Sequence, residues 1–368
     1  MSPVNICLLG DARSIHLQRI SMGLAQRGVS VRVVTHKPIA IAGVVVETFQ
    51  VPPTGWTNLR GWSARRSHYL RGLFRKSDIV HVHFLADWGL NPEIQSEGCL
   101  AVTPWGSDIT PPIGEGAPSD ELLTARRGLL QNAQLITAWG PRFAEAIAQF
   151  ASISLSRVQM MPLGVDTALF RRMHQFESES NDRMIVGFFK GFRCVYGAPV
   201  FVRAMPRIAE AVPGVRFCMI GDGAELESCQ RLASDLGVDR LIEWVPRQPH
   251  HGLPRHLEQW QVSVIPSLQE SFGLAALEAS AMELPVVASD VGGLSDVVRH
   301  GETGRLVAPG DAGALADAVV ALLGDANERQ RLASRGRDMV KRGFEWGRIM
   351  DRWIETYARL REERCVMV

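Results

Sequence analysis

The chain has no excess of charge of one sign, no long apolar run and no cluster of cysteines, and each absence excludes a class of protein. Its 40 Lys and Arg residues balance 39 Asp and Glu residues, so the net charge of +1 gives no bias toward nucleic acid or membrane. No stretch has the apolar length that a membrane-spanning helix needs. The first residues are typical of a strand and lack the basic and apolar segments of a signal peptide.

The 6 cysteines are scattered and show no spacing that is typical of metal ligands. Cys7 and Cys218 lie in apolar runs, so the simplest interpretation is that they are core residues. The sequence also lacks the paired aspartates of a divalent-cation site. These absences predict a protein of a reducing cytoplasm that works without a metal ion.

What the chain has is a repeated alternation of short apolar runs with helical patterns. At 368 residues it is longer than one ordinary hydrophobic core, so we expect two domains of comparable size. The run at 5–9, a helical pattern and the run at 29–35 form a βαβ unit, whose strands should be parallel. Further strands of the first half are expected at 78–84, 100–105 and 135–139.

The alternation restarts in the second half, after a charged, Ser-rich stretch. Strands are expected at 184–189, 215–220, 241–245, 262–265, 285–289 and 305–307, and helices at 198–212, 224–236, 251–260 and 274–282. The pattern predicts two doubly wound α/β domains, with ligands at the carboxyl ends of the strands. The expected divisions are a first domain at 1–170, a linker at 171–183, a second domain at 184–345 and a C-terminal helix at 346–368 that crosses back to the first domain.

One polar loop in the second half has the character of a binding site. The run at 262–265 gives way to a loop that ends at Gly273, and helix-forming residues follow. A helix N-terminus presents unpaired N–H groups and partial positive charge, which favour phosphate. Glu270 in the loop and Glu278 one turn into the helix would both face such a ligand. The alternative is a surface loop and an ordinary helix with solvated glutamates.

The stretch 270–279 reads Glu-Ser-Phe-Gly-Leu-Ala-Ala-Leu-Glu-Ala, and further recurring patterns surround it. They lie at 162–170, 221–226, 285–294 and 301–307. In this order the set resembles the retaining glycosyltransferases of the GT-B fold, in particular glycosyltransferase family 4. The similarity covers most of the chain. It implies an α/β fold in which two Rossmann-like, doubly wound domains face a shared cleft.

The resemblance implies roles for the residues around the two glutamates. Glu278 would accept hydrogen bonds from the ribose hydroxyls of a nucleotide sugar, and Glu270 would hold hydroxyls of the donor sugar at the catalytic centre. The pyrophosphate would lie near Gly221 and on the start of the helix, at Ser271, Phe272, Gly273 and Leu274. No cofactor is implied, because the nucleotide diphosphate sugar is itself the donor substrate.

The cations expected beside the pyrophosphate fall where the chain departs from the family pattern. The family usually supplies an Arg and a Lys from the loop after the second domain's first strand. Here Gly187-Phe188 replaces the usual Gly-Arg, and Tyr196-Gly197 replaces Lys-Gly. We predict Lys190 first and Arg193 second as phosphate ligands; the alternative for Lys190 is a solvated loop cation. Arg247 lies where the family contacts the base, largely through backbone.

The first domain offers three candidates at the ends of its strands. Gly10 follows the first strand, where a glycine lets the backbone approach the donor closely. His83 lies nearer the carboxyl end of its strand than His81, and is the better candidate for a catalytic position in the cleft. Asp108 follows the next strand, where many relatives carry a catalytic-site histidine. It would either orient the acceptor hydroxyl or cap the following turn.

Residues 60–76 form the clearest charge cluster of the chain, with six cations and no acid. The apolar face of this helical pattern consists of Trp62, Tyr69, Leu70, Leu73 and Phe74. Such a helix suits peripheral docking on anionic lipid, as in glycosyltransferases that modify lipid-linked acceptors. The alternative is a packed helix with a basic outer face. Both fit a cytoplasmic protein, and docking would place it on the inner face of the membrane.

The resemblance implies a retaining hexosyltransferase that moves a sugar from a UDP- or GDP-sugar to an acceptor hydroxyl. The acceptor would be a sugar, a lipid-linked molecule or another glycoconjugate, in the synthesis of cell-surface polysaccharide or glycolipid. Two alternatives stay open: a nucleotide-sugar epimerase of the same architecture, and a noncatalytic nucleotide-sugar-binding partner subunit. A Rossmann dehydrogenase is least favoured, because no Gly-x-Gly-x-x-Gly follows the first strand.

Overall fold

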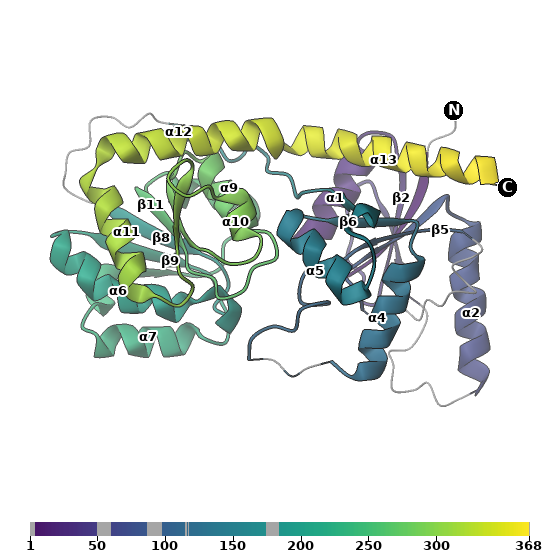
Figure 1. The fold of residues 1–368 in the computed structure, drawn as a ribbon, viewed down its shortest axis with the longest axis horizontal. Helices are drawn as coiled ribbons and strands as arrows, with labels where there is room; N and C mark the ends of the chain where they lie inside the picture. Colours follow the sequence, from purple (N-terminus) through teal and green to yellow (C-terminus); the bar gives the residue numbers. More distant parts are fainter. Residues whose placement is uncertain are drawn as a thin grey trace. The chain divides into compact units, whose positions relative to one another are not determined.

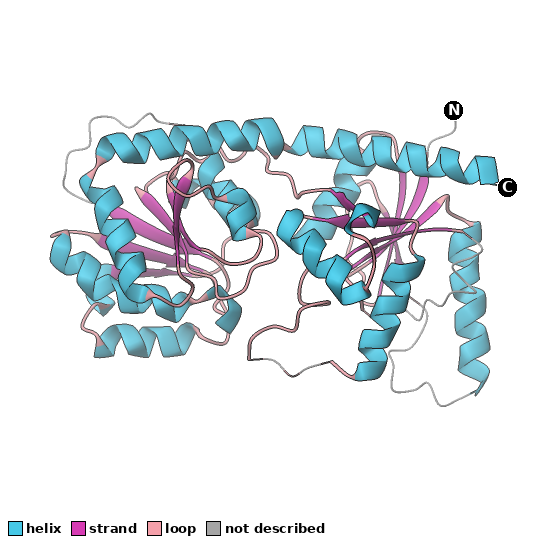
Figure 2. Ribbon diagram, viewed as in Figure 1, coloured by secondary structure: helices cyan, strands magenta, loops and turns pink. Residues whose placement is uncertain are grey.

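The structure is a computed structural model that describes residues 4–49, 60–86, 98–114, 116, 118–173 and 184–367, with the backbone alone at 60–67 and 364–367. The chain divides into two α/β units (Figure 1; Figure 2). Unit 1 contains residues 1–111, 116–162 and 348–368, and unit 2 contains residues 112–115 and 163–347. The expected linker at 171–183 thus begins within unit 2, and its residues 174–183 lie outside the described residues.

Unit 1 is built on a parallel sheet of seven strands in the order β3-β2-β1-β4-β5-β6-β7. Its inner strands are buried and largely apolar, as a sheet covered on both faces requires. The strands are β1 Asn5–Leu9, β2 Ser30–Thr35, β3 Val45–Thr48, β4 Ile79–His83, β5 Cys99–Thr103, β6 Leu135–Ala138 and β7 Val158–Met160. The helices of this part are α1 Ile15–Ala25, α2 Arg60–Arg75, α4 Asp120–Asn132 and α5 Pro141–Ala151.

Unit 2 repeats the plan with a parallel sheet of six strands in the order β10-β9-β8-β11-β12-β13. The strands are β8 Ile185–Phe189, β9 Arg216–Ile220, β10 Ile242–Val245, β11 Val262–Ile265, β12 Val286–Ser289 and β13 Gly304–Val307. The helices are α6 Ala198–Ala211, α7 Leu226–Asp235, α8 Pro254–Leu257, α9 Leu274–Ala281, α10 Leu294–Val297, α11 Ala312–Gly324 and α12 Ala326–Gly343. The predicted doubly wound α/β fold is confirmed.

Two layers of helices cover the sheet of unit 2. Helices α6 and α11 pack together over one face, and α9 packs against α12 over the other. Only glycine fits at position 187 in β8 on that second face, because a Cβ would lie 2.1 Å from the ring of buried Trp260. The next residue, Phe188, is fully buried in the opposite core, so position 188 faces neither solvent nor ligand.

The last helix, α13 Trp346–Met367, begins in unit 2 and belongs to unit 1 from Arg348 onward. Trp353 and Tyr357 are buried at 1% exposure, and the Tyr357 hydroxyl lies 2.6 Å from Nδ1 of His81 in β4. On the other side of the helix, Arg27 pairs with Asp351 at 3.1 Å. The helix is therefore part of the core of unit 1.

The expected helix at 251–260 is broken in the structure. A 3-10 turn, His250–Gly252, precedes the short helix α8. Pro254 stands at the start of α8, where its missing N–H is harmless, and Gly252 separates the two turns. Because the segment is broken, His250 lies on a 3-10 turn close to the end of β10.

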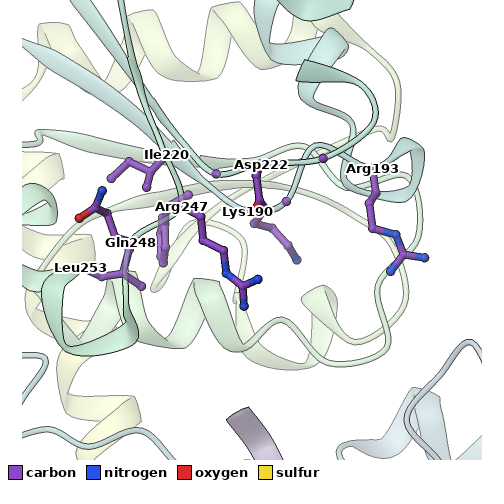
Figure 3. Close-up of a pocket in the computed structure, with 11 residues that line it drawn as sticks. Lys190, Arg193, Ile220, Asp222, Arg247, Gln248 and Leu253 are labelled. Atoms are coloured by element: carbon purple, nitrogen blue, oxygen red, sulfur yellow. The ribbon is translucent and has the colours of Figure 1, made fainter. Parts of the chain in front are cut away.

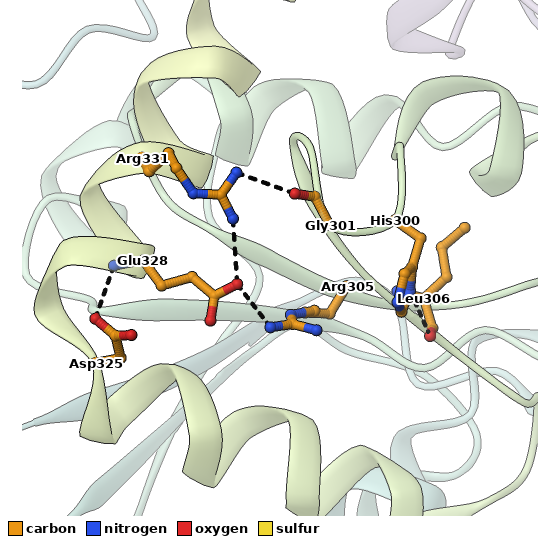
Figure 4. A network of polar contacts seen from close by, with 7 residues as sticks. All are labelled: His300, Gly301, Arg305, Leu306, Asp325, Glu328 and Arg331. Atoms are coloured by element: carbon orange, nitrogen blue, oxygen red, sulfur yellow. Dashed lines mark hydrogen bonds and ion pairs between the residues drawn. The ribbon is translucent and has the colours of Figure 1, made fainter.

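A polar network joins α12 to the turn before β13 (Figure 4). Oε1 of Glu328 accepts hydrogen bonds from Arg305 at 2.6 Å and from Arg331 at 3.3 Å. Arg331 also donates to the Gly301 carbonyl at 3.1 Å, and Asp325 caps α12 by accepting from the Glu328 N–H at 2.9 Å. The network holds the glycine-containing turn against the helix and so fixes the edge of the sheet.

In both sheets the order in which the chain adds strands reverses near the centre. The reversal lies between β1 and β4 in unit 1 and between β8 and β11 in unit 2. On either side of such a point the connections lead away in opposite directions. This opens a crevice at the carboxyl ends of the two central strands, where ligands of doubly wound proteins bind. Gly10 and His83 lie at these strand ends in unit 1, and Lys190 and Glu270 follow them in unit 2.

Candidate functional site

The loops after β8 and β9 lie against each other through glycines. The Phe192 N–H donates to the Asp222 carbonyl at 2.7 Å. Gly221 has a φ of 154°, and a Cβ there would lie 2.2 Å from the Lys190 carbonyl oxygen. Gly223 has a φ of 145° and would meet the Phe192 carbonyl oxygen at 2.4 Å. Only glycine fits at both positions, and the two loops therefore pack backbone against backbone.

The loop after β11 ends at the N-terminus of α9, as predicted. Gly273 is the N-cap residue with a φ of 101°, and its carbonyl accepts from the Ala276 N–H at 2.9 Å. The Phe272 side chain is buried and packs 6.1 Å from the ring of Phe344. The first turn of α9, from Leu274, therefore presents backbone N–H groups on an anchored loop.

The segment after β12 supports this loop from behind. The Gly293 N–H donates to the Glu270 carbonyl at 3.0 Å. A Cβ on Gly293 would lie 2.4 Å from the carbonyl oxygen of Ser271, and one on Gly292 would lie 2.0 Å from that of Glu270. This close approach explains why two glycines occur in the stretch 285–294, and it fixes the backbone that carries Glu270.

Lys190 and Glu270 form an ion pair across the central strands β8 and β11. The Lys190 ammonium donates to Oε2 of Glu270, and their side chains are only 10% and 12% exposed. The ammonium also lies 4.1 Å from the centroid of the Tyr196 ring. Ser267 Oγ is 3.5 Å from the same carboxylate oxygen. The structure thus brings together the first predicted phosphate cation and the predicted sugar-binding acid, and Lys190 is not a solvated loop cation.

Glu278 pairs with a residue that the sequence did not single out. Nε2 of His250 lies 2.7 Å from Oε1 of Glu278, whose side chain is 6% exposed. The His250 ring packs 5.0 Å from the ring of Phe170. A buried carboxylate needs a hydrogen-bond partner, and His250 supplies it. The only signal in the sequence is the position of His250 shortly after a predicted strand.

A cavity of about 400 Å³ lies at the carboxyl ends of β8, β9 and β10 (Figure 3). Lys190 and Arg247 extend from the ends of β8 and β10 in the same direction. The cavity is lined by Phe189, Lys190, Gly191, Arg193, Ile220, Gly221, Asp222, Gly223, Arg247, Gln248 and Leu253. Three of the lining side chains are cations and one is a carboxylate, so the cavity favours an anionic ligand. Four predicted residues share it, namely Lys190, Arg193, Gly221 and Arg247.

In unit 1, the first strand ends at Gly10 with little space around it. A Cβ on Gly10 would lie 2.8 Å from Leu17 Cδ2 and 3.3 Å from the His83 carbonyl oxygen. Trp105, after β5, meets the ring of His16 edge to face at 5.6 Å. The carboxyl ends of β1, β4 and β5 therefore converge, and Gly10 allows its neighbours to approach.

The two histidines of β4 are both buried but differ in their hydrogen bonds. His81 hydrogen-bonds Tyr357 through Nδ1 and Thr103 through Nε2 at 2.7 Å. His83 is fully buried, and neither ring nitrogen has a hydrogen-bond partner within the parts of the chain that the structure describes. Burial lowers the pKa of His83 to about 3. A group with this pKa is neutral at pH 7 and available as a hydrogen-bond donor or acceptor.

Asp108 occupies the capping position rather than an open one. Its buried carboxylate accepts hydrogen bonds from the N–H groups of Leu85 at 2.8 Å, Trp105 at 2.9 Å and Gly106 at 2.8 Å. Arg126 donates to the carbonyls of Leu85 and Asp108, both at 2.7 Å. Burial raises the pKa of the Asp108 carboxyl, and the backbone N–H groups oppose that rise. The geometry matches the alternative in which Asp108 caps the turn.

Helix α2 buries its apolar side chains within unit 1. Leu70 is 0%, Leu73 is 3% and Phe74 is 1% exposed, while Arg75 and Lys76 are exposed. The predicted contribution of Trp62 lies outside the described side chains. These three apolar residues are part of the core, so the described part of α2 matches a packed helix with a basic outer face.

Two further findings concern metal sites and membrane-spanning helices. Among the described residues, no group of three or more His, Cys, Asp or Glu side chains is placed to hold a metal ion. No helix in the same part of the chain is long and apolar enough to cross a membrane.

The fold and the paired glutamates define the class of protein, and comparison with solved structures agrees. Sucrose-phosphate synthase from Thermosynechococcus elongatus superimposes with a TM-score of 0.80 at 21% identity, covering 97% of this chain and 99% of that one. Anabaena Alr3699/HepE, in complex with UDP, gives a TM-score of 0.79 at 19% identity over 97% of this chain and 100% of that one. The chain has the GT-B glycosyltransferase fold.

Sequence comparison gives the family. The model described as "Glycosyl transferases group 1" matches residues 170–339, and that described as "Glycosyltransferase Family 4" matches residues 14–169. The chain belongs to this glycosyltransferase family, which confirms the resemblance carried by the stretch 270–279. D-inositol 3-phosphate glycosyltransferase of Nocardia farcinica is 26% identical over 95% of this chain and 85% of its own length. The protein of that name from Mycobacterium tuberculosis is 26% identical over 95% of this chain and 79% of its own.

Proposed function

We propose that this glycosyltransferase is a retaining, metal-independent hexosyltransferase that uses a UDP- or GDP-sugar as donor. The observation that carries the proposal is the pairing of Glu270 with Lys190 and of Glu278 with His250, beside an anion-favouring cavity at the carboxyl ends of β8, β9 and β10. The Anabaena protein has been solved in complex with UDP and with UDP-glucose, which supports a donor of this kind.

Each part of the site has a role in the proposed reaction. Glu278 accepts hydrogen bonds from the ribose hydroxyls and Glu270 from hydroxyls of the donor sugar, while Arg247 lies beside the base. The bond between the anomeric carbon and the diphosphate oxygen breaks, and a bond to the acceptor oxygen forms on the same face of the sugar. The acceptor proton passes to the departing diphosphate. Lys190, Arg193 and the N–H groups at the start of α9, from Ser271 to Leu274, stabilise the charge that develops there.

The acceptor is proposed as a class only. It carries a nucleophilic hydroxyl on a sugar, a lipid-linked molecule or another glycoconjugate, and the product belongs to cell-surface polysaccharide or glycolipid synthesis. The curated relatives act on a phosphorylated inositol by name, which supports a polyol or sugar acceptor. Peripheral contact of residues 60–76 with anionic lipid would rest on exposed cations such as Arg75 and Lys76. Sedimentation with anionic and with neutral vesicles tests that contact.

A panel of UDP- and GDP-sugars tests the proposed function. The protein is incubated with each donor and with simple glycoside acceptors, and the anomeric proton couplings of donor and product are compared by NMR. Transfer with retained configuration, undiminished by a chelator, is expected. Inverted product or dependence on added metal contradicts that part of the proposal. Interconversion of the donor sugar without transfer would identify an epimerase, and binding without turnover a noncatalytic subunit.

A further inference from the structure

The Lys190 ammonium lies between a carboxylate and an aromatic ring. On one side it pairs with Oε2 of Glu270, and on the other it lies 4.1 Å from the centroid of the Tyr196 ring. The Lys190 side chain is 10% exposed, although it lines the cavity at the strand ends. A lysine at the edge of a cavity normally keeps its side-chain freedom and its water shell. Here both are largely removed before any ligand binds.

The local backbone fixes the ring and the carboxylate relative to each other. Tyr196 ends a 3-10 turn that closes with its N–H donating to the Arg193 carbonyl at 2.9 Å. The Val195 carbonyl accepts from the N–H groups of Leu268 at 2.8 Å and Gln269 at 3.1 Å. The turn that carries Tyr196 is therefore hydrogen-bonded directly to the loop that carries Glu270.

Gly197 locks the same junction. It has a φ of 63°, and a Cβ there would lie 2.0 Å from the Pro266 carbonyl oxygen. Gly191 lies beside the ring, and a Cβ there would lie 3.8 Å from Tyr196 Cε2, an ordinary contact distance. The close contact across Gly197 fixes the backbone that carries the ring, and the ring face lies against the Lys190 ammonium. The backbone position of Tyr196 is thus set by contacts that do not involve the Lys190 side chain.

The two partners of Lys190 differ in what they do to its charge. The ring is neutral, so it attracts the ammonium through its negative face and leaves the positive charge free to act on an anion. The Glu270 carboxylate compensates that charge. A diphosphate can replace a carboxylate as the counter-ion of Lys190, but it does not compete with the neutral ring.

We propose that Tyr196 is a positioning residue that holds the Lys190 ammonium for the donor diphosphate, and that Glu270 is its exchangeable partner. The inference rests on the proposed function, because it assumes that the cavity binds a nucleotide diphosphate sugar. Donor binding transfers Lys190 from Glu270 to the diphosphate and frees the carboxylate for sugar hydroxyls. An intact nucleotide sugar satisfies both groups, whereas a nucleoside diphosphate satisfies Lys190 alone and leaves Glu270 without its cation.

The test compares three substitutions in the full-length protein by calorimetric titration with the UDP or GDP that the wild type binds, and with the matching nucleoside. Tyr196→Phe keeps the ring and should change neither affinity by more than about twofold. Tyr196→Leu removes the ring and should weaken diphosphate binding by roughly 3- to 30-fold while leaving nucleoside binding unchanged. Phe150→Leu is the matched control, because it removes a ring that lies 5.2 Å from the Arg127 guanidinium in unit 1. It should change neither affinity.

A rescue experiment adds a measurement whose result a purely structural role of Tyr196 would not change. Since the ring lies against the ammonium, a lysine at position 196 would bring its own ammonium to the same wall of the cavity. Lys190→Ala should weaken diphosphate binding, and adding Tyr196→Lys should restore at least part of the loss. Restoration supports the geometry, and no restoration counts against it.

The outcomes separate the two proposals. If the wild type binds neither UDP, GDP nor their sugars, the proposed function fails and the role of Tyr196 fails with it. If the wild type binds one of them and Tyr196→Leu binds it equally well, only the role of Tyr196 is overturned. Equal losses of diphosphate and nucleoside affinity in Tyr196→Leu would also overturn it, since they indicate damage to the site as a whole.

Discussion

Nε2 of His250 lies 2.7 Å from Oε1 of Glu278, and the pair joins the turn after β10 to helix α9. The glutamate side chain is 6% exposed and the histidine 20%. A carboxylate held in one orientation binds ribose hydroxyls better than one that must first be ordered. His250 thus holds the Glu278 carboxylate in one orientation, although it lies outside the sequence patterns that carry the resemblance.

His250→Ala should weaken binding of the nucleoside and of the nucleoside diphosphate alike. Removing one partner from a nearly buried carboxylate costs about 1–2 kcal/mol, which corresponds to roughly 5- to 30-fold in affinity. His251→Ala is the matched control, because the neighbouring histidine is exposed. Titration calorimetry measures both variants. Equal affinities for wild type and His250→Ala would show that the pair does not orient Glu278 for binding.

Lys190→Ala should act on the diphosphate and spare the nucleoside. A charge-assisted hydrogen bond to phosphate contributes enough that its loss lowers affinity by roughly 10- to 100-fold. Arg203→Ala, which removes an exposed cation of α6, serves as control for the loss of one positive charge. Similar losses for diphosphate and nucleoside would mean that Lys190 does not contact phosphate.

The buried histidines of β4 should make the free energy of unfolding depend on pH. Burial holds the pKa of His81 well below its usual range and that of His83 at about 3, so both stay neutral when folded. The unfolded chain protonates them near pH 6.5 and then binds more protons than the folded state. Stability is therefore complete above about pH 6.5. It falls as pH decreases, by up to about 1.4 kcal/mol per pH unit for each histidine.

His83→Phe tests this dependence, because it leaves no nitrogen unpartnered and keeps a ring of similar size. Urea unfolding between about pH 5 and pH 7.5 should show a shallower loss of stability in the variant than in the wild type. Parallel curves would indicate that His83 does not titrate on unfolding. The same variant shows whether His83 takes part in catalysis, since a structural role alone predicts full activity.

Much of the fold follows from the sequence because its inner strands are buried apolar runs. Strands such as β4 and β11 were predicted for that reason. Val45–Thr48 and Val158–Met160 were missed, since these edge strands are short, partly exposed and interrupted by polar residues. The helix expected at 251–260 was wrong because Gly252 and Pro254 divide it.

The site was predictable only where a local pattern carries it. The N-terminus of α9 at Gly273 could be predicted from a loop, a glycine and a helix that adjoin in sequence. The partner of Glu278 could not, because 28 positions separate it from His250 and no periodicity relates the two. The Tyr196 ring under Lys190 likewise depends on how two loops pack. Asp108 shows the opposite case, in which a predicted polar residue is fully engaged by backbone N–H groups.

The central claim is that the Glu270–Glu278 stretch forms the donor site, and titration of Glu278→Ala tests it most directly. The titrant is the nucleoside diphosphate that the wild type binds, and thermal unfolding confirms that the variant is folded. Binding should fall by at least about 100-fold, because the ribose loses its acceptor and His250 its partner. An affinity equal to that of the wild type would contradict the assignment of the site.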